Sequence, residues 1–204
     1  MTANHDVAGT AAPTRRSQAK ADRRRQLLRA AARLIAERGY TGVRLEDLGS
    51  AVGISGPAVY RHFSNKEALL VELLVGISAR LFDGGTAVVE STPDAELALA
   101  GLIEFHLDFA LGESDLIRVQ DRDLGSLPDP ARRQVRQYQR RYVELWVQVL
   151  CKTDPALSET DARTKAHATF GLINSTPHSA NPATPTRTRD VLRRMTVAAL
   201  APGV

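Results

Sequence analysis

Apolar residues recur at helical spacing along nearly the whole chain, and no stretch alternates with the period of two that a β-strand requires. Between residues 22 and 38, for example, one helix face carries apolar side chains at positions i, i+4, i+7 and i+8, namely Leu27, Ala31, Leu34 and Ile35. This pattern predicts an all-α fold. The 204 residues are enough for one large domain or two small domains packed together.

Glycine and capping residues divide the pattern into separate helices. Gly39 and Gly53 are placed to end two of them in the left-handed conformation, and Ser55 is a good N-cap for the next. Ser64–Glu67 has the spacing of a capping box, and the long helix that follows is expected to stop at Gly84–Gly85. A turn-rich loop is expected at residues 181–185. The predicted helices cover about residues 22–38, 45–52, 56–62, 67–84, 94–111, 115–123, 128–151, 158–176 and 187–201.

The charge of the chain is divided unevenly. Residues 1–66 carry 12 Lys and Arg against 5 Asp and Glu, whereas residues 67–204 carry 15 against 18. The formal net charge of +4 is therefore the sum of a basic part of +7 and a mildly acidic part of −3. Such asymmetry favours a polyanion as the partner of the basic part.

Cysteine content and hydropathy indicate a reducing, aqueous compartment. Cys151 is the single cysteine, so no disulfide can form within the chain. The most apolar stretch, residues 68–77, is interrupted by Glu72, whereas a bilayer span needs roughly 20 apolar residues. No apolar signal segment follows a basic start. We therefore expect a cytoplasmic protein with no membrane partner.

Two short predicted helices meet at a tight turn around Gly53, with longer helices before and after, and this order is typical of a helix-turn-helix. The second short helix would enter the major groove of duplex DNA, where small residues let the backbone approach the base edges. The residues at its start meet that need: Ser55, Gly56, Pro57 and Ala58. Three residues further along can reach phosphate oxygens, contacts that fix register rather than read sequence: Tyr60, His62 and Lys66.

The run from Gly53 to Leu70, GISGPAVYRHFSNKEALL, resembles the signature of the TetR family of bacterial transcriptional regulators. The likeness covers about residues 22–82. It implies that Tyr60, His62 and Lys66 contact phosphates and that residues 55–58 form the start of the recognition helix. Where the family usually has a capping Thr or Ser, this chain has Val43–Arg44, and Ala58 stands where many members have a hydroxyl. Base reading is therefore expected to depend more on Arg61, Arg44 and DNA shape.

The resemblance also implies an architecture for the rest of the chain. Family members carry an all-α effector-binding and dimerisation domain, and their last two helices, here about 158–176 and 187–201, usually pack against the partner subunit. A homodimer on a pseudo-palindromic operator, released by a small-molecule effector, follows from the likeness. The run Gly171–Ser179, together with residues 53–57, is similar to actinobacterial members tied to fatty or branched-chain acyl catabolism, which implies an acyl-CoA or other apolar effector. The expected domains are a flexible basic arm (1–20), a helix-turn-helix domain (21–66) and an effector-binding domain (67–204) whose residues 67–84 form a connecting helix.

Aromatic residues at helical spacing in the second domain are either core residues or the lining of a pocket, and the sequence leaves both interpretations open. Two polar residues near them could orient a ligand or be satisfied within their helices. The candidate ligand-binding residues are Phe105, His106, Phe109, Tyr138, Tyr142, Trp146, Phe170 and Asn174.

Catalytic and metal-binding spacings are missing from the sequence. The five histidines are scattered, so no metal site and no cofactor are expected, and the chain is predicted not to be an enzyme. Two alternatives stay open: a helical acyl-ligand-binding module or enzyme with a vestigial DNA-binding head, and an architectural protein that binds random and promoter DNA equally.

Overall fold

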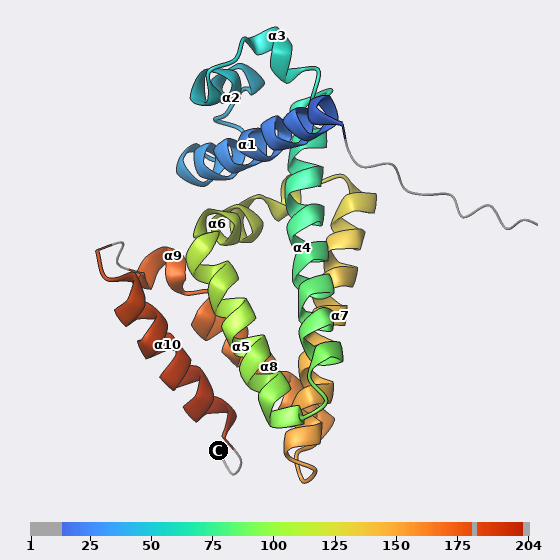
Figure 1. The fold of residues 1–204 in the computed structure, drawn as a ribbon, viewed down its shortest axis with the longest axis vertical. Coiled ribbons are helices and arrows are strands. Elements are labelled where there is room, and N and C mark those ends of the chain that lie inside the picture. Colours follow the sequence, from blue (N-terminus) through green and yellow to red (C-terminus); the bar gives the residue numbers. More distant parts are fainter. Residues whose placement is uncertain (1–13, 181–182, 202–204) are drawn as a thin grey trace, which may run out of the picture.

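The structure, a computed structural model, describes residues 14–180 and 183–201, and every regular element in these ranges is helical, which confirms the all-α prediction. Figure 1 shows α1–α3 grouped at one end of the long helix α4, with the later helices arranged along the rest of it. The elements are α1 (Arg15–Arg38), α2 (Leu45–Val52), α3 (Gly56–Val59), α4 (Lys66–Ser91), α5 (Ala95–Gly112), α6 (Ser114–Asp123), the 3-10 turn η1 (Leu124–Ser126), α7 (Asp129–Thr153), α8 (Glu159–Ile173), α9 (Thr176–Ser179) and α10 (Pro185–Leu200). We call α1–α3 with the start of α4 the head, and α5–α10 with the rest of α4 the body.

Helix α1 is longer than the sequence pattern predicts. It begins at Arg15, because Thr14 caps it by accepting a hydrogen bond from the Ser17 N–H at 3.2 Å. The residues that follow are good helix formers even though they lack apolar periodicity. The prediction of a flexible arm over residues 1–20 is therefore wrong from Arg15 onward, and its residues 1–13 lie outside the described residues.

The turn between α2 and α3 depends on two glycines. Gly53 ends α2 in the left-handed conformation with φ of 72°, as predicted. A Cβ at the buried Gly49 would lie 2.8 Å from the Ile54 carbonyl oxygen, so the two helices can pack this closely only over glycine. Helix α3 is shorter than the predicted 56–62, because the backbone beyond Val59 continues in tight turns, with the His62 N–H bonded to the Val59 carbonyl at 2.8 Å.

Two predictions about the ends of helix α4 are wrong. Its N-cap is Asn65, whose side chain accepts from the Ala68 N–H at 2.7 Å, rather than Ser64. The helix also runs through Gly84 and Gly85 to Ser91. A Cβ at Gly84 would overlap the ring of Phe105 from α5, and one at Gly85 would overlap the ring of Tyr142 from α7. These glycines serve helix packing, not helix termination.

Two clusters of buried apolar residues form the core. The first joins α1, α2 and α4 through residues such as Leu27 and Leu70, and it also takes in Leu116 of α6. The second lies inside the body around Trp146. Because α6 contributes to the first cluster, the head is packed directly onto the body and not only joined to it through α4.

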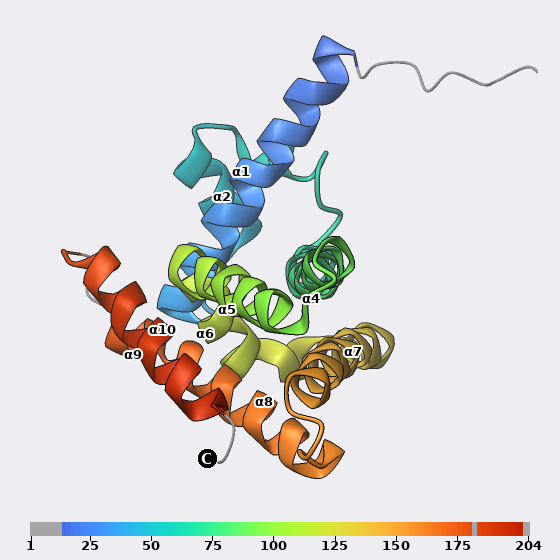
Figure 2. The same ribbon diagram turned by 60° about the horizontal axis from the view of Figure 1, so that its bottom comes forward.

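The C-terminal helices lie on the outside of the body, and α10 occupies its edge in both views (Figures 1 and 2). Ser158 caps α8 as predicted, accepting from the Asp161 N–H at 3.1 Å. The predicted helix 158–176 is divided into α8 and α9, because Pro177 cannot continue the α8 hydrogen bonds. Of the predicted loop 181–185, residues 181–182 lie outside the described residues and Pro185 already belongs to α10. Among the described residues, no helix is long and apolar enough to cross a membrane.

Candidate functional site

The start of α3 presents small side chains toward solvent. Ser55 precedes the helix in an extended conformation, and its hydroxyl makes no capping hydrogen bond. Pro57 lies in the first turn, where no N–H is needed. Ser55 and Pro57 are exposed, Gly56 and Ala58 are half-buried, and Val59 is fully buried in the head core. The four residues predicted to approach base edges thus lie together on the outer side of the head.

Tyr60, at the end of α3, is exposed but already has a polar partner. Its hydroxyl donates to Glu46 Oε1 of α2 at 2.8 Å. This hydrogen bond to the carboxylate raises the pKa of Tyr60, and Glu46 itself has a pKa lowered first by a backbone hydrogen bond and then by Tyr60. A phosphate contact by Tyr60 requires the hydroxyl to turn away from Glu46, a residue that the sequence pattern did not single out.

His62 is half-buried, and its Nδ1 is buried without a hydrogen-bond partner. Burial lowers its pKa, and the nearby cations Arg24, Lys20 and Arg23 lower it further. The imidazole is therefore neutral at physiological pH in the free protein. A phosphate placed beside it would oppose this effect and favour the charged ring.

Lys66 has a structural role that its sequence motif does not reveal. Its ammonium donates to the carbonyls of Tyr40 at 2.8 Å and Val43 at 3.1 Å, and it lies 4.4 Å from the centre of the Tyr40 ring. The Tyr40 N–H is bound in turn by the buried carboxylate of Asp123 at 3.3 Å. Lys66 thereby fixes the loop between α1 and α2, and only the remaining ammonium proton is available to a phosphate.

Arg44, just before α2, and Arg61, just after α3, have exposed side chains. The Arg44 backbone N–H donates to Asp47 Oδ2 at 2.8 Å, so the carboxylate of Asp47 bonds to the start of α2. Within the described residues, neither guanidinium makes an ion pair or a hydrogen bond. Both are free to reach DNA.

Two arginines of α1 instead hold the head together. Arg24 forms a two-pronged ion pair with Glu72 of α4, donates to the His62 carbonyl, and lies 4.5 Å from the centre of the Phe63 ring. Arg23 donates to the Val52 carbonyl at 3.2 Å, at the end of α2. No sequence signal distinguishes these two arginines from their neighbours.

Six of the eight candidate ligand-binding residues converge in the body. His106 of α5 lies at their centre, with its Nδ1 3.3 Å from the Tyr142 hydroxyl and its Nε2 3.1 Å from Asn174 Oδ1. Four rings surround the imidazole, with centroids 5.0–6.2 Å away: Phe109, Tyr142, Trp146 and Phe170. We call these six residues the His106 cluster. The rings touch one another, so a ligand can enter only if some of them move apart.

The His106 cluster is uncharged. Complete burial lowers the pKa of His106 to about 4, and burial raises the pKa of Tyr142. The neutral imidazole donates from one nitrogen and accepts at the other. Such a site suits an apolar or aromatic group with a neutral polar atom and excludes a buried charge. Among the described residues, no group of His, Cys, Asp and Glu could hold a metal ion.

Phe105 and Tyr138 lie elsewhere. Phe105 packs against α4 at Gly84, and Tyr138 packs against Phe82, with ring centres 6.2 Å apart. Both are half-buried residues at the α4 surface of the body. Helical spacing put them among the candidates but could not say which neighbouring helix each would face.

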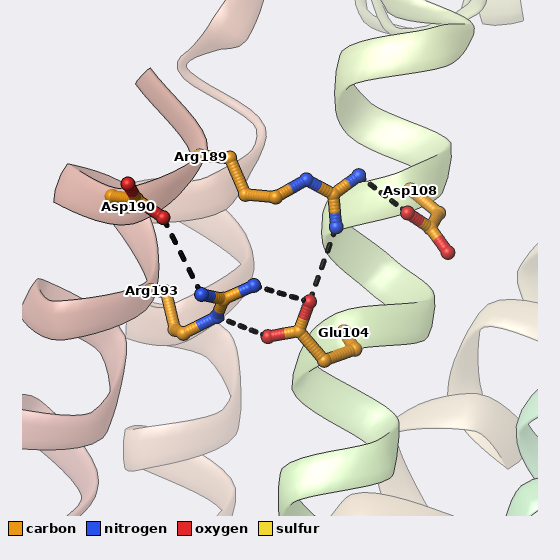
Figure 3. Close-up of polar contacts among 5 residues, drawn as sticks. All are labelled: Glu104, Asp108, Arg189, Asp190 and Arg193. Atoms are coloured by element: carbon orange, nitrogen blue, oxygen red, sulfur yellow. Dashed lines mark hydrogen bonds and ion pairs between the residues drawn. The ribbon is translucent and has the colours of Figure 1, made fainter. Parts of the chain in front are cut away.

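Helix α5 connects the His106 cluster to α10. On its outer side Glu104 accepts from Arg193 at 2.8 Å and from Arg189 at 3.1 Å, while Asp108 also binds Arg189 and Asp190 pairs with Arg193 at 3.4 Å (Figure 3). We call this group the α5–α10 clamp. It fixes α10 against the helix that carries His106.

Helix α6 connects the body to the head through two arginines one turn apart. Arg118 donates to the Pro177 carbonyl, three residues after Asn174 of the His106 cluster. Arg122 donates to the carbonyls of Ile35 and Ala36 at the end of α1. Through these two arginines, α6 contacts both the segment around Pro177 and the end of α1.

The geometry defines a class of protein: a helix-turn-helix DNA-binding head packed on a helical body that has its own buried polar cluster. A model of the bacterial regulatory proteins of the tetR family matches residues 27–73. A model of the tetracyclin repressor-like C-terminal domain matches residues 92–201, more than half of the chain. The chain therefore belongs to the TetR family of bacterial transcriptional regulators.

Individual relatives agree with this assignment. The HTH-type transcriptional repressor KstR2 of Rhodococcus jostii is 35% identical over 94 residues, which is 46% of either chain. The chain thus spans about half the length of this curated relative. Among solved structures, the TetR family regulator PfmR of Thermus thermophilus is 25% identical, with a TM-score of 0.73 over 86% of this chain and 97% of that one. AibR, solved with isovaleryl coenzyme A and operator DNA, has the same fold at 20% identity, with a TM-score of 0.68 over 85% of this chain and 97% of that one.

Proposed function

We propose that this protein is a one-component transcriptional repressor that binds a pseudo-palindromic operator as a homodimer and is released by a small acyl-bearing effector. The observation that carries the proposal is the outer side of the head. There the small residues 55–58 lie together with the exposed guanidinium groups of Arg44 and Arg61, which make no hydrogen bond or ion pair in the described part of the chain. A protein with this function acts in the cytoplasm, where the DNA is, and performs no catalysis.

Binding to DNA assigns a role to each part of the head. The start of α3 enters the major groove, and Arg61 and Arg44 reach base edges or the flanking backbone. Tyr60, His62 and Lys66 contact phosphates and fix the register of α3. Tyr60 exchanges its hydrogen bond with Glu46 for one with a phosphate.

The second subunit packs against α8 and α10. Helix α10 exposes apolar side chains that a monomer would leave in water: Val191 at 38% and Met195 at 51% exposure on one flank, and Val197 at 54% on the other. Placing Met195→Glu in this surface should convert the dimer to a monomer in sedimentation velocity. Gln148→Glu, which adds the same charge on the exposed side of α7, is the control and should stay dimeric. A Met195→Glu protein that stays dimeric would place the interface elsewhere.

The acyl part of the effector enters the His106 cluster, and its charged part stays outside. The uncharged, aromatic composition of the cluster supports this placement, as does the isovaleryl coenzyme A complex of AibR. Mass spectrometry of small molecules that co-purify with the native protein tests it. We expect an acyl compound with wild-type protein and its loss with Phe170→Trp, which fills the cluster, whereas retention by that variant would contradict the placement.

Selection from genomic DNA tests the function itself. Purified protein is mixed with fragmented DNA of its source organism, and the bound fragments are sequenced. We expect enrichment of fragments that share a two-fold symmetric motif, including DNA upstream of its own gene. Bound fragments without a common motif would support an architectural DNA-binding protein, and no bound DNA would support a ligand-binding module with a vestigial head.

A further inference from the structure

A groove of about 910 Å³ lies where the head meets the body, away from the His106 cluster. Its walls come from α1, from the middle of α4 and from the turn between α5 and α6. Figure 1 shows α1 lying above α6 and passing α4 near the upper end of α4. We call this space the junction groove. Its volume lies within the range of about 300–1,000 Å³ that is usual for small-molecule sites.

The junction groove has an apolar floor. Leu73 and Ile77 of α4 and Leu116 of α6 line it, each at most 6% exposed, and Leu28 and Ala32 of α1 complete it. Gly76 of α4 also lines the groove, and a Cβ at this position would meet no atom within 4 Å. The floor therefore has unoccupied space for the apolar part of a ligand.

Arginines form one rim of the groove. Arg25, Arg29 and Arg33 follow each other at intervals of one turn on α1, and all three are exposed. Groups at this spacing are neighbours on a helix surface, so two guanidinium groups can hold one carboxylate or phosphate between them. The rim thus places cations beside an apolar floor.

Most charged side chains that line the groove are already paired. Arg24 neutralises Glu72, and Arg80 pairs with Glu113 at 2.8 Å. Arg29, in contrast, makes no hydrogen bond or ion pair within the described residues.

The two arginines beside Arg29 on the rim differ in how closely an acid binds them. Arg25 is bound by Asp22, whereas Arg33 reaches Glu37 only at 3.9 Å, an exposed contact worth little. Asp115, in the first turn of α6 on the opposite wall, makes no ion pair or side-chain hydrogen bond within the described ranges. Arg29 and Arg33 are thus the cations available to a ligand.

We propose that the junction groove binds a small amphipathic anion, with its apolar chain on the floor against Leu73 and Ile77 and its charged group between Arg29 and Arg33. This site is separate from the His106 cluster and is additional to the proposed effector site. A molecule in it touches α1 of the head and α4 and α6 of the body at once. If the ligand binds the free and the DNA-bound arrangements of the head with different affinity, DNA and ligand change each other's affinity by the same factor.

Methyl NMR spectroscopy of the full-length protein without DNA tests the proposal. Octanoate, octyl phosphate and the uncharged 1-octanol are titrated separately, and the methyl signals of Leu73, Ile77 and Leu116 report on the groove. We expect both anions to shift these signals and 1-octanol to bind at least about tenfold more weakly, since a charge-assisted hydrogen bond is lost. The relative affinity of the two anions tells whether a carboxylate or a phosphate is preferred. Equal affinity for the alcohol, or shifts confined to other methyl groups, would overturn the proposal.

Three variants and one control sharpen the test. Gly76→Leu places a side chain over the floor, where an added Cβ meets no atom within 4 Å, and should abolish the shifts. Arg29→Gln should weaken both anions about tenfold and leave 1-octanol unaffected, and Asp115→Asn should strengthen both anions because a like charge is removed. Arg133→Gln, an exposed arginine of α7 outside the groove, is the control and should change nothing. Undiminished binding to Gly76→Leu would refute the site, and because these measurements contain no DNA, they succeed or fail independently of the proposed repressor function.

Discussion

At the scale of single residues, the same side chains stabilise the free head and are predicted to contact DNA. Lys66 binds two loop carbonyls, and Tyr60 binds Glu46. These contacts pre-organise the reading surface, so part of the ordering cost of binding DNA is met during folding. A substitution at either position consequently changes both the stability of the head and its affinity for DNA.

Replacement of Lys66 by Met separates these two effects. The variant keeps the apolar stem but leaves the Tyr40 and Val43 carbonyls without their donor, so the free energy of unfolding should fall by about 1–3 kcal/mol in urea denaturation. The slope of log affinity against log salt should also decrease by about one if a phosphate contact is lost. Lys66→Arg is the matched control and should retain the slope. A loss of affinity that differs between DNA sequences would contradict the phosphate role.

His62 should make operator binding depend on pH. Its pKa is lowered in the free protein by burial and by Arg24, Lys20 and Arg23, and a phosphate beside the ring would raise it in the complex. A proton is then taken up on binding, so affinity should increase as the pH falls from about 8 to about 6. Fluorescence anisotropy of wild-type and His62→Gln proteins measures the difference. Identical pH profiles would show that His62 does not approach a phosphate.

His106 should make the folded protein less stable as the pH falls, whereas a salt-bridged histidine would make it more stable. Its pKa in the folded protein is about 4, below that of the unfolded chain, so between these values the unfolded chain binds the extra proton and folding weakens as the pH falls. From pH 6.5 to pH 5 the wild-type protein should lose about 2 kcal/mol more than His106→Gln in urea denaturation. Parallel losses would mean that the imidazole is accessible to protons in the folded state.

At the scale of helices, sequence reasoning succeeded where local chemistry decides the outcome and failed where tertiary contacts decide it. The turn at Gly53 and the capping of α8 by Ser158 are local, and both were predicted. Gly84 and Gly85 look like a helix end in sequence, yet they are closely packed positions where rings of α5 and α7 approach α4. No pattern within α4 itself could reveal those partners.

The α5–α10 clamp should contribute more to the dimer than to the fold. Glu104 and its arginines are partly exposed, so Glu104→Gln should cost under about 1 kcal/mol of stability. Because α10 is the proposed dimer helix, its looser attachment should weaken dimerisation measurably in sedimentation velocity. Asp190→Asn removes only a contact within α10 and is the control. Equal dissociation constants for the two variants would show that the clamp does not support the interface.

At the scale of the whole molecule, the sequence predicted many of the residues that come together in the body. It did not predict the contacts that join the helices of the body to the head. Five other candidates do converge on His106, because their helical spacing puts them on inward faces. Arg118 and Arg122 of α6 hold the segment around Pro177 and the end of α1 through backbone carbonyls far away in sequence. Carbonyl acceptors leave no signature in a sequence, so these connections, like the junction groove, become visible only in the folded protein.

We propose above all that the head reads specific duplex DNA. This proposal is tested most directly by fluorescence anisotropy titrations of the wild-type protein with DNA from upstream of its own gene and with a shuffled duplex of equal length, across a range of salt concentrations. We expect that affinity for both falls steeply with salt, and that at physiological salt the upstream DNA binds at least about 10³-fold more tightly. Equal affinity for the two duplexes at physiological salt would contradict this proposal.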